Sequence, residues 1–170
     1  MKNAFVVVTA LFLFCSTMAA QNSEESRKSL KGIAGFYVSV EPLDPVIEKE
    51  GLTANQIRSD VELRLGMAGI NVITKEQASQ TPGKPLLRID LAIGSKQGLY
   101  PYALDISAHQ MVKLERDQAV VVYATTWSVG SGGIAGLTNI RAAVRDLVDE
   151  LINAWLSMNP EATAVGGNRR

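Results

Sequence analysis

Apolar and polar residues alternate with a period of two in three stretches of the chain, at residues 34–40, 87–93 and 104–115. Such alternation is typical of a β-strand with one buried face. Residues 119–129 are instead apolar on both faces and rich in Val, Thr, Tyr and Trp. This composition predicts a strand that lies in the middle of a sheet or has its second face covered. A short strand is also expected at residues 70–74.

Two other stretches repeat apolar residues at helical spacing. The first begins with Thr53 and Gln56, which have the spacing of a capping box, and runs as far as Gly69. The second is expected to begin at Thr138 or Asn139 as the N-cap and to end before the Asn-Pro pair near the C-terminus. Each helix carries one apolar face and therefore needs one surface to pack against.

The order of these elements predicts the fold. A strand, a helix and a strand in close succession indicate a right-handed crossover between two parallel strands. Short connections then join three strands, which we expect to run antiparallel in a meander before the last helix. The sequence therefore predicts an α+β two-layer sandwich, with a five-stranded mixed sheet and two amphipathic helices in the order βαββββα. If both helices pack on one face, the other face of the sheet is open.

The first 20 residues have the features of a signal peptide. A basic start at Lys2 precedes an apolar run over residues 4–15, and small residues follow up to Ala19 and Ala20. The apolar run is shorter than the roughly 20 residues of a membrane-spanning helix. Cys15 follows three bulky apolar residues, a context unlike that of a lipidated cysteine. We therefore expect an exported, non-lipidated chain that begins near residue 21 and is periplasmic or extracellular.

The remaining chain is expected to form one domain with short extensions. Residues 21–31 are polar, charged and aperiodic, which predicts a flexible leader. Residues 32–160 contain all the predicted strands and helices and form the single α/β domain. Residues 161–170 are rich in Ala and Gly and are expected to be a disordered tail.

Charge and cysteine content exclude several classes of function. The chain has 17 basic and 17 acidic residues, and loss of Lys2 with the signal peptide leaves a net charge of −1. Nothing in this balance favours nucleic acid or an anionic membrane as a partner. Loss of Cys15 removes the only cysteine, so disulfides, thiolate metal sites and thiol nucleophiles are excluded. With one histidine, we expect no metal site, and no cofactor is indicated.

The predicted open face of the sheet is polar and is our candidate surface for a protein partner. It carries Arg88, Asp90, Asp105, Ser107, His109 and Lys113. Ser107 and His109 are two residues apart on one strand and also suggest part of a hydrolase triad. Asp90 and Asp105 lie on neighbouring strands and suggest a carboxylate pair for acid–base chemistry. A solvated sheet face without a catalytic role explains the same residues.

A glycine-rich segment at residues 130–136 matches the pattern G-x-G-x-x-G/A, through Gly130, Ser131, Gly132 and Gly133. Between a strand and a helix, such a segment offers backbone N–H groups to an anion. A nucleotide is not favoured, because the helix begins too late, no parallel strand follows and an exported protein lies outside nucleotide pools. An anion loop and a plain connection remain the alternatives.

Aromatic residues offer two more alternatives. Trp127 and Trp155 are expected in the core, and a sugar-stacking platform is the functional alternative. Residues 98–102 place Leu99, Tyr100 and Tyr102 at a turn, as an exposed recognition tip or as ordinary packing.

Three stretches resemble an uncharacterised family of exported bacterial proteins. They are residues 52–73, the run Ala124-Thr125-Thr126-Trp127, and residues 147–160. The layout of elements also resembles the N-terminal domain of TolB and related envelope assembly modules, which bind protein partners. The resemblance assigns no activity. Because the sequence has no recognisable catalytic site, we expect a non-enzymatic exported domain that binds a protein partner in the cell envelope, through the open sheet face or an edge strand. A protein that binds a small anion or sugar is the alternative, and a hydrolase is third.

Overall fold

The computed structural model describes residues 22–94 and 98–161. Its sheet has five strands in the order β2-β1-β3-β4-β5. The strands are β1 (Gly35–Val40), β2 (Asn71–Val72), β3 (Leu86–Ile93), β4 (Tyr100–Leu114) and β5 (Asp117–Ala135). β1 pairs in parallel with β2 and β3, whereas β3 with β4 and β4 with β5 are antiparallel pairs. The predicted α+β fold with a five-stranded mixed sheet is confirmed.

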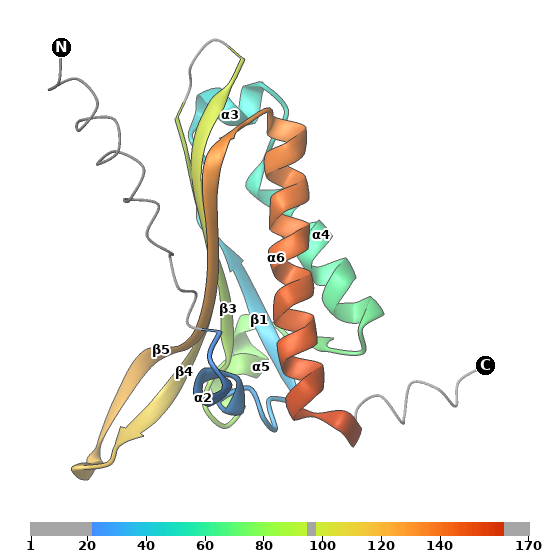
Figure 1. Cartoon of the computed structure of the whole chain (residues 1–170). Helices are drawn as coiled ribbons and strands as arrows, with labels where there is room; N and C mark the ends of the chain where they lie inside the picture. Colours follow the sequence, from blue (N-terminus) through green and yellow to red (C-terminus); the bar gives the residue numbers. More distant parts are fainter. Residues whose placement is uncertain (1–21, 95–97, 162–170) are drawn as a thin grey trace, which may run out of the picture.

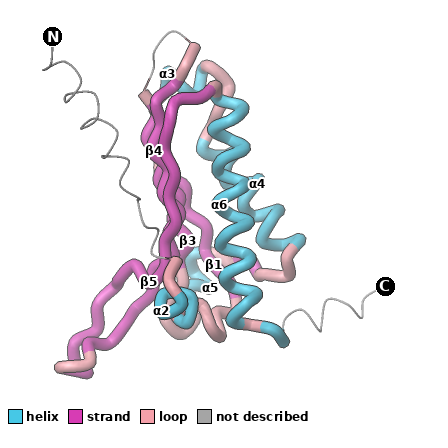
Figure 2. Tube along the Cα trace, viewed as in Figure 1, coloured by secondary structure: helices cyan, strands magenta, loops and turns pink. Residues whose placement is uncertain are grey.

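Two long helices cover one face of this sheet. They are α4 (Ala54–Met67) and α6 (Leu137–Met158), which lie side by side (Figure 1, Figure 2). α4 begins with the predicted capping box, in which the Thr53 hydroxyl accepts from the Gln56 N–H and the Gln56 side chain accepts from the Thr53 N–H. Its buried residues Ile57, Val61 and Leu65 recur at helical spacing. The core therefore lies between the sheet and the α4–α6 layer.

Three short helices were not predicted. They are α2 (Glu24–Lys28), α3 (Pro45–Lys49) and α5 (Lys75–Gln80). Five or six residues are too few to show a helical period, and a side-chain N-cap stabilises each of the three helices instead. The Asp44 side chain accepts from the Val46 N–H before α3, and Thr74 with Gln77 forms a capping box before α5. The two-helix prediction is thus correct for the covering layer and incomplete for the connections.

The N-terminal segment, residues 22–31, is ordered in the structure, so the prediction of a flexible leader is wrong there. Leu30 is 0% exposed and belongs to the core. The Asn22 side chain accepts a hydrogen bond of 3.1 Å from the Trp127 indole N–H. The Asn159 amide donates to the Leu30 carbonyl at 3.1 Å. One buried leucine and side-chain hydrogen bonds anchor the segment without any periodic pattern that the sequence could show.

β5 differs from its prediction in length and place. Pairing with β4 continues through Gly132 and Gly133 as far as Ala135, so residues 130–135 are strand and the predicted break is wrong. The ladder leaves little room for side chains here, since a Cβ on Gly132 would lie 3.1 Å from the Tyr102 carbonyl oxygen. β5 is also an edge strand, not a central one. α6 begins at once after Gly136, which caps it without a side-chain bond, in place of the expected Thr138 or Asn139.

Both tryptophans lie in the core, as predicted. Trp127 on β5 is 0% exposed and Trp155 on α6 is 4% exposed. The Trp155 indole N–H donates to the Ile33 carbonyl at 3.1 Å. Buried rings offer no face to a sugar, so the stacking-platform alternative is wrong.

The predicted signal peptide, residues 1–20, lies outside the described residues, and so does the predicted tail at 161–170 apart from Glu161. Among the described helices, none combines the length and the apolar character needed to cross a membrane.

Candidate functional site

β3 and β4 place five of the six predicted polar-face residues next to one another. The register sets Arg88 opposite Ser107, Asp90 opposite Asp105, and Leu86 opposite His109. Residues directly opposite in an antiparallel pair share a face, so the predicted cluster exists. Lys113 does not belong to it, because β3 begins at Leu86 and β4 continues beyond that point with β5 as its neighbour.

Arg88 is held by two carboxylates within the cluster. Its Nε lies 3.2 Å from Glu41 Oε1 and its Nη2 lies 3.3 Å from Asp90 Oδ2. All three side chains are partly exposed, so these pairs are solvated and individually weak. The charge of Arg88 is therefore already neutralised by Glu41 and Asp90. Asp90 and Asp105 are both exposed, and Asp90 is the one that pairs with Arg88. This arrangement does not resemble a pair of carboxylates that share a proton.

Ser107 and His109 do contact each other, as their spacing predicts. Ser107 Oγ lies 3.1 Å from His109 Nε2. The other ring nitrogen, Nδ1, faces the hydroxyl of Thr125 at 3.4 Å, and the ring stacks on Tyr123 with centroids 5.7 Å apart. A triad needs a carboxylate at this nitrogen to orient and charge the ring. Ser107 is also only 4% exposed, so the pair is better explained as a structural contact.

The charge on His109 depends on its neighbours. Burial lowers the pKa of His109 below 6.5, the Arg88 charge lowers it further, and the Asp105 carboxylate opposes both. The folded state therefore favours the neutral ring. The stability gained in this way is complete above pH 6.5 and is lost as the pH falls from 6.5 through the pKa of the folded protein.

We predict that Arg88→Gln raises the pKa of His109 and that Asp105→Asn lowers it further, because each change removes one neighbouring charge. The chain has a single histidine, so an NMR titration of the imidazole protons reports it without overlap. Lys113→Gln is the control and should leave the value unchanged. An unchanged pKa in Arg88→Gln would contradict the cluster.

The glycine segment does not form an anion loop. Gly130, Ser131, Gly132 and Gly133 all lie in the β4–β5 ladder, opposite residues 102–105. Their backbone is therefore strand, separated from α6, whose first residue is Leu137.

The turn at residues 98–102 combines an exposed apolar residue with a packed one. Leu99 is exposed, whereas Tyr100 is buried and its hydroxyl donates a 2.7 Å hydrogen bond to Glu50.

The ends of β4 and β5 form a feature that the sequence analysis missed. Beyond the β-bulge at Ala108 and His109 the two strands have left β3 and extend away from the sheet (Figure 1, Figure 2). We call residues 110–124 the projecting hairpin. Its register sets Met111 opposite Tyr123 and Lys113 opposite Val121.

The projecting hairpin exposes apolar side chains on both of its faces. Val120, Val121 and Tyr123 are 39%, 46% and 44% exposed. The two-sided apolar pattern predicts a central or covered strand, and within the described chain this part of β5 is neither. The same signal fits a strand whose cover is another molecule.

Among the described residues, no group of three or more His, Asp or Glu side chains is arranged to hold a metal ion. In comparisons with known proteins, no family model matches this chain and no curated protein matches it.

Proposed function

We propose that this chain is a non-enzymatic exported domain, periplasmic or extracellular, that binds a protein partner by accepting an extended segment of it along β5. The observation that carries the proposal is the projecting hairpin, where an apolar edge strand is presented away from the sheet. The export part of the proposal rests on the signal-peptide features of residues 1–20.

β5 has the properties of an edge that receives another strand. An edge strand presents unpaired backbone N–H and C=O groups, and proteins normally protect it with charged residues or proline. Residues 118–135 of β5 contain neither a charged residue nor a proline. An extended segment of a partner would pair with these groups, as in other cases of β-strand addition.

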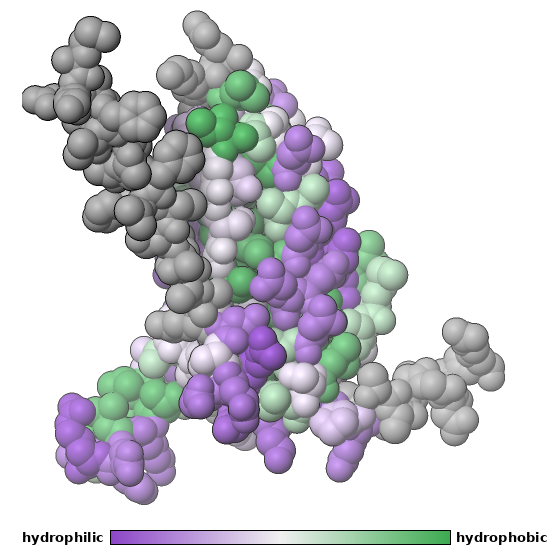
Figure 3. Space-filling view, in the orientation of Figure 1, coloured by the Kyte–Doolittle hydropathy of each residue, from purple (hydrophilic) through white to green (hydrophobic). Residues whose placement is uncertain are grey.

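The side chains of the projecting hairpin provide an apolar contact surface. Figure 3 shows a hydrophobic patch on the hairpin, with a hydrophilic tip beyond it. Val121 and Tyr123 alternate with Val120 and Val122, so an added strand would meet apolar side chains above and below it. Burial of such surface stabilises a complex by about 25 cal/mol per Å² before the costs of association are subtracted.

The N-terminal segment limits where a partner strand can lie. The Ser29 hydroxyl donates to the Thr126 carbonyl at 3.2 Å, so the segment already reaches β5 at the base of the hairpin. We therefore place the partner strand along residues 117–125, on the hairpin side of this contact. His109 stacks on Tyr123 within this stretch, so the polar cluster lies beside the proposed contact and is the second surface that a partner would meet.

A photo-cross-linking experiment tests the proposal. The cross-linking residue p-benzoylphenylalanine replaces Val121 in the projecting hairpin or, as a matched control, Val46 on α3, which is 51% exposed. In the producing cell we expect a discrete protein adduct from position 121 and none from position 46. Mass spectrometry should locate the adduct in an extended segment of the partner. Equal labelling at both positions, or none at position 121, would refute strand addition.

Val121→Lys provides a second, independent prediction. The lysine should change the free energy of unfolding by no more than about 0.5 kcal/mol, because the site is exposed. It should abolish the adduct formed from a cross-linker at Tyr123, because a charge on an edge strand opposes pairing. Val46→Lys is the control and should leave that adduct in place. A persistent adduct in Val121→Lys would argue against an apolar edge contact.

A further inference from the structure

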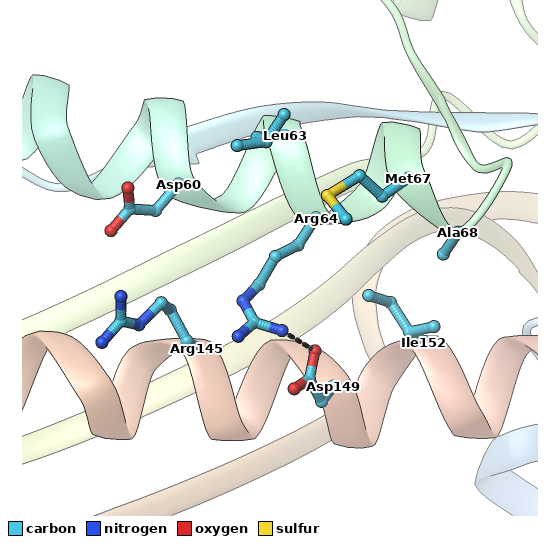
Figure 4. A pocket seen from close by; sticks show the side chains of 8 residues that line it. All are labelled: Asp60, Leu63, Arg64, Met67, Ala68, Arg145, Asp149 and Ile152. Atoms are coloured by element: carbon cyan, nitrogen blue, oxygen red, sulfur yellow. Dashed lines mark hydrogen bonds and ion pairs between the residues drawn. The ribbon is translucent and has the colours of Figure 1, made fainter.

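A cleft between α4 and α6 lies apart from the projecting hairpin and takes no part in the proposed function. Its volume is about 480 Å³, within the range of sites that bind small molecules. Leu63, Met67, Ala68 and Ile152 contribute apolar lining. The charged lining consists of two acids and two arginines, Asp60, Arg64, Arg145 and Asp149 (Figure 4). We call this feature the interhelical cleft.

Two ion pairs bridge the helices at the cleft. Arg141 donates two hydrogen bonds to the carboxylate of Asp60, from Nε at 2.6 Å and from Nη2 at 2.8 Å. Arg64 on α4 pairs with Asp149 on α6, as Figure 4 shows. Each pair joins one positive and one negative side chain, so the charges of these four residues cancel.

Arg145 is the fifth charge of the group and has no such partner. It lies four residues from both Arg141 and Asp149 on α6, on the side that faces α4 (Figure 4). Within residues 22–94 and 98–161 it makes neither a hydrogen bond nor an ion pair. The pKa of Asp60 is lowered chiefly by its hydrogen bond from Arg141, and the Arg145 charge adds to this effect. When Arg141 beside the cleft is counted as the partner of Asp60, Arg145 is the one charged residue of these five without an ion-pair partner.

The other end of the cleft is apolar and unusually exposed. Leu63 and Met67 are one turn apart on α4 and are 64% and 80% exposed. Ile152 lies across from them on α6 and is buried (Figure 4). In Figure 4, Met67 and Ile152 lie toward one end of the cleft and Arg145 toward the other. A ligand that matches the cleft would place a negative group at the Arg145 end and a hydrocarbon portion at the Met67 and Ile152 end.

We propose that the interhelical cleft binds an anionic amphiphile with a single charge, a carboxylate on an unbranched alkyl chain. The carboxylate pairs with the guanidinium of Arg145, which suits it because a guanidinium can donate two parallel hydrogen bonds to a carboxylate. The alkyl chain lies against Leu63, Met67 and Ile152. A single negative charge matches the single positive charge that the two ion pairs leave over.

Titration with dodecanoate, kept below its micelle concentration, tests the proposal on the protein purified after export. Calorimetry should give saturable 1:1 binding, and the methyl NMR signals of Leu63, Met67 and Ile152 should shift together. Decanoate should bind more weakly, by up to about fourfold for each missing methylene that the cleft buries. Dodecyltrimethylammonium has an alkyl chain about one methylene longer and the opposite charge, and it should still bind at least tenfold more weakly than dodecanoate.

Two variants assign the binding to the proposed residues. Arg145→Gln should weaken dodecanoate binding at least tenfold, whereas Arg116→Gln, at the tip of the hairpin, should not change it. Met67→Ser should weaken dodecanoate more than octanoate, because the longer chain reaches further along the apolar end. Circular dichroism checks that each variant is folded, and Arg145 takes part in no ion pair that folding needs.

Three results would overturn the proposal. One is equal affinity for the carboxylate and the ammonium amphiphile, which would indicate adsorption of detergent. Another is unchanged dodecanoate affinity in Arg145→Gln. The third is binding to vesicles of anionic phospholipid without binding of monomeric dodecanoate, which would indicate a membrane-contact surface. None of these results concerns the projecting hairpin, so the proposal of partner binding is tested independently by the cross-linking experiment.

Discussion

Leu30→Ala is expected to lower the free energy of unfolding by about 2–5 kcal/mol, the usual range for removal of a buried leucine side chain. Leu30 is 0% exposed and joins the main hydrophobic core. The backbone around it is fixed as well, since the Gln110 amide donates to the Ser29 carbonyl at 3.0 Å and the Asn159 amide to the Leu30 carbonyl at 3.1 Å. The cavity left by alanine therefore has little freedom to collapse.

Urea denaturation measures the effect, and Lys28→Ala is its control. Lys28 lies two residues away in the same segment, but its side chain is 61% exposed and its ion pair with Glu24 is solvated. The control should change stability by no more than about 0.5 kcal/mol. If both variants were equally mild, the segment would be the flexible leader that its composition suggests.

Trp127→Ala should be at least as costly, at about 3–5 kcal/mol, because a fully buried indole is removed from the hydrophobic core. The variant also removes the indole N–H that donates to the side-chain oxygen of Asn22, Oδ1, in the folded protein. Trp127→Phe separates the two contributions. It keeps much of the ring volume and should cost less than Trp127→Ala, with about 1 kcal/mol of its cost due to the lost hydrogen bond.

Tyr123→Ala is the matched control for this second prediction. Tyr123 and Trp127 are aromatic residues of the same strand, but Tyr123 lies in the projecting hairpin and is 44% exposed. Thermal unfolding should therefore show a small shift for Tyr123→Ala and a large one for Trp127→Ala. Comparable shifts would mean that the hairpin packs on the domain and is not available to a partner.

Several elements follow from the sequence alone because their signals are local. The alternation in β1 and β3 records which residues face the core, and the Thr53–Gln56 pair marks where α4 begins. The contact between Ser107 and His109 was also predictable, since residues two apart on a strand share a face. Each of these inferences depends on residues within a few positions of one another.

The N-terminal segment and the cross-helix ion pairs were not predictable, because they depend on contacts between residues far apart in the chain. Leu30 is one apolar residue in a polar stretch, and only the fold shows that Trp127 and Asn159 lie beside its segment. Asp60 and Arg141 are separated by 81 positions and meet because α4 and α6 pack on the same face of the sheet.

The place of β5 was decided by tertiary structure alone. Its apolar residues on both faces are a local property that predicts burial without specifying what covers the strand. Strand order depends on which edge each strand joins, and β5 joins β4 at the outer edge because the antiparallel meander continues in that direction. Part of its apolar surface thus lies outside the core. Composition indicates that these residues tend to be buried, whereas the topology of the sheet determines whether other parts of this chain pack over them.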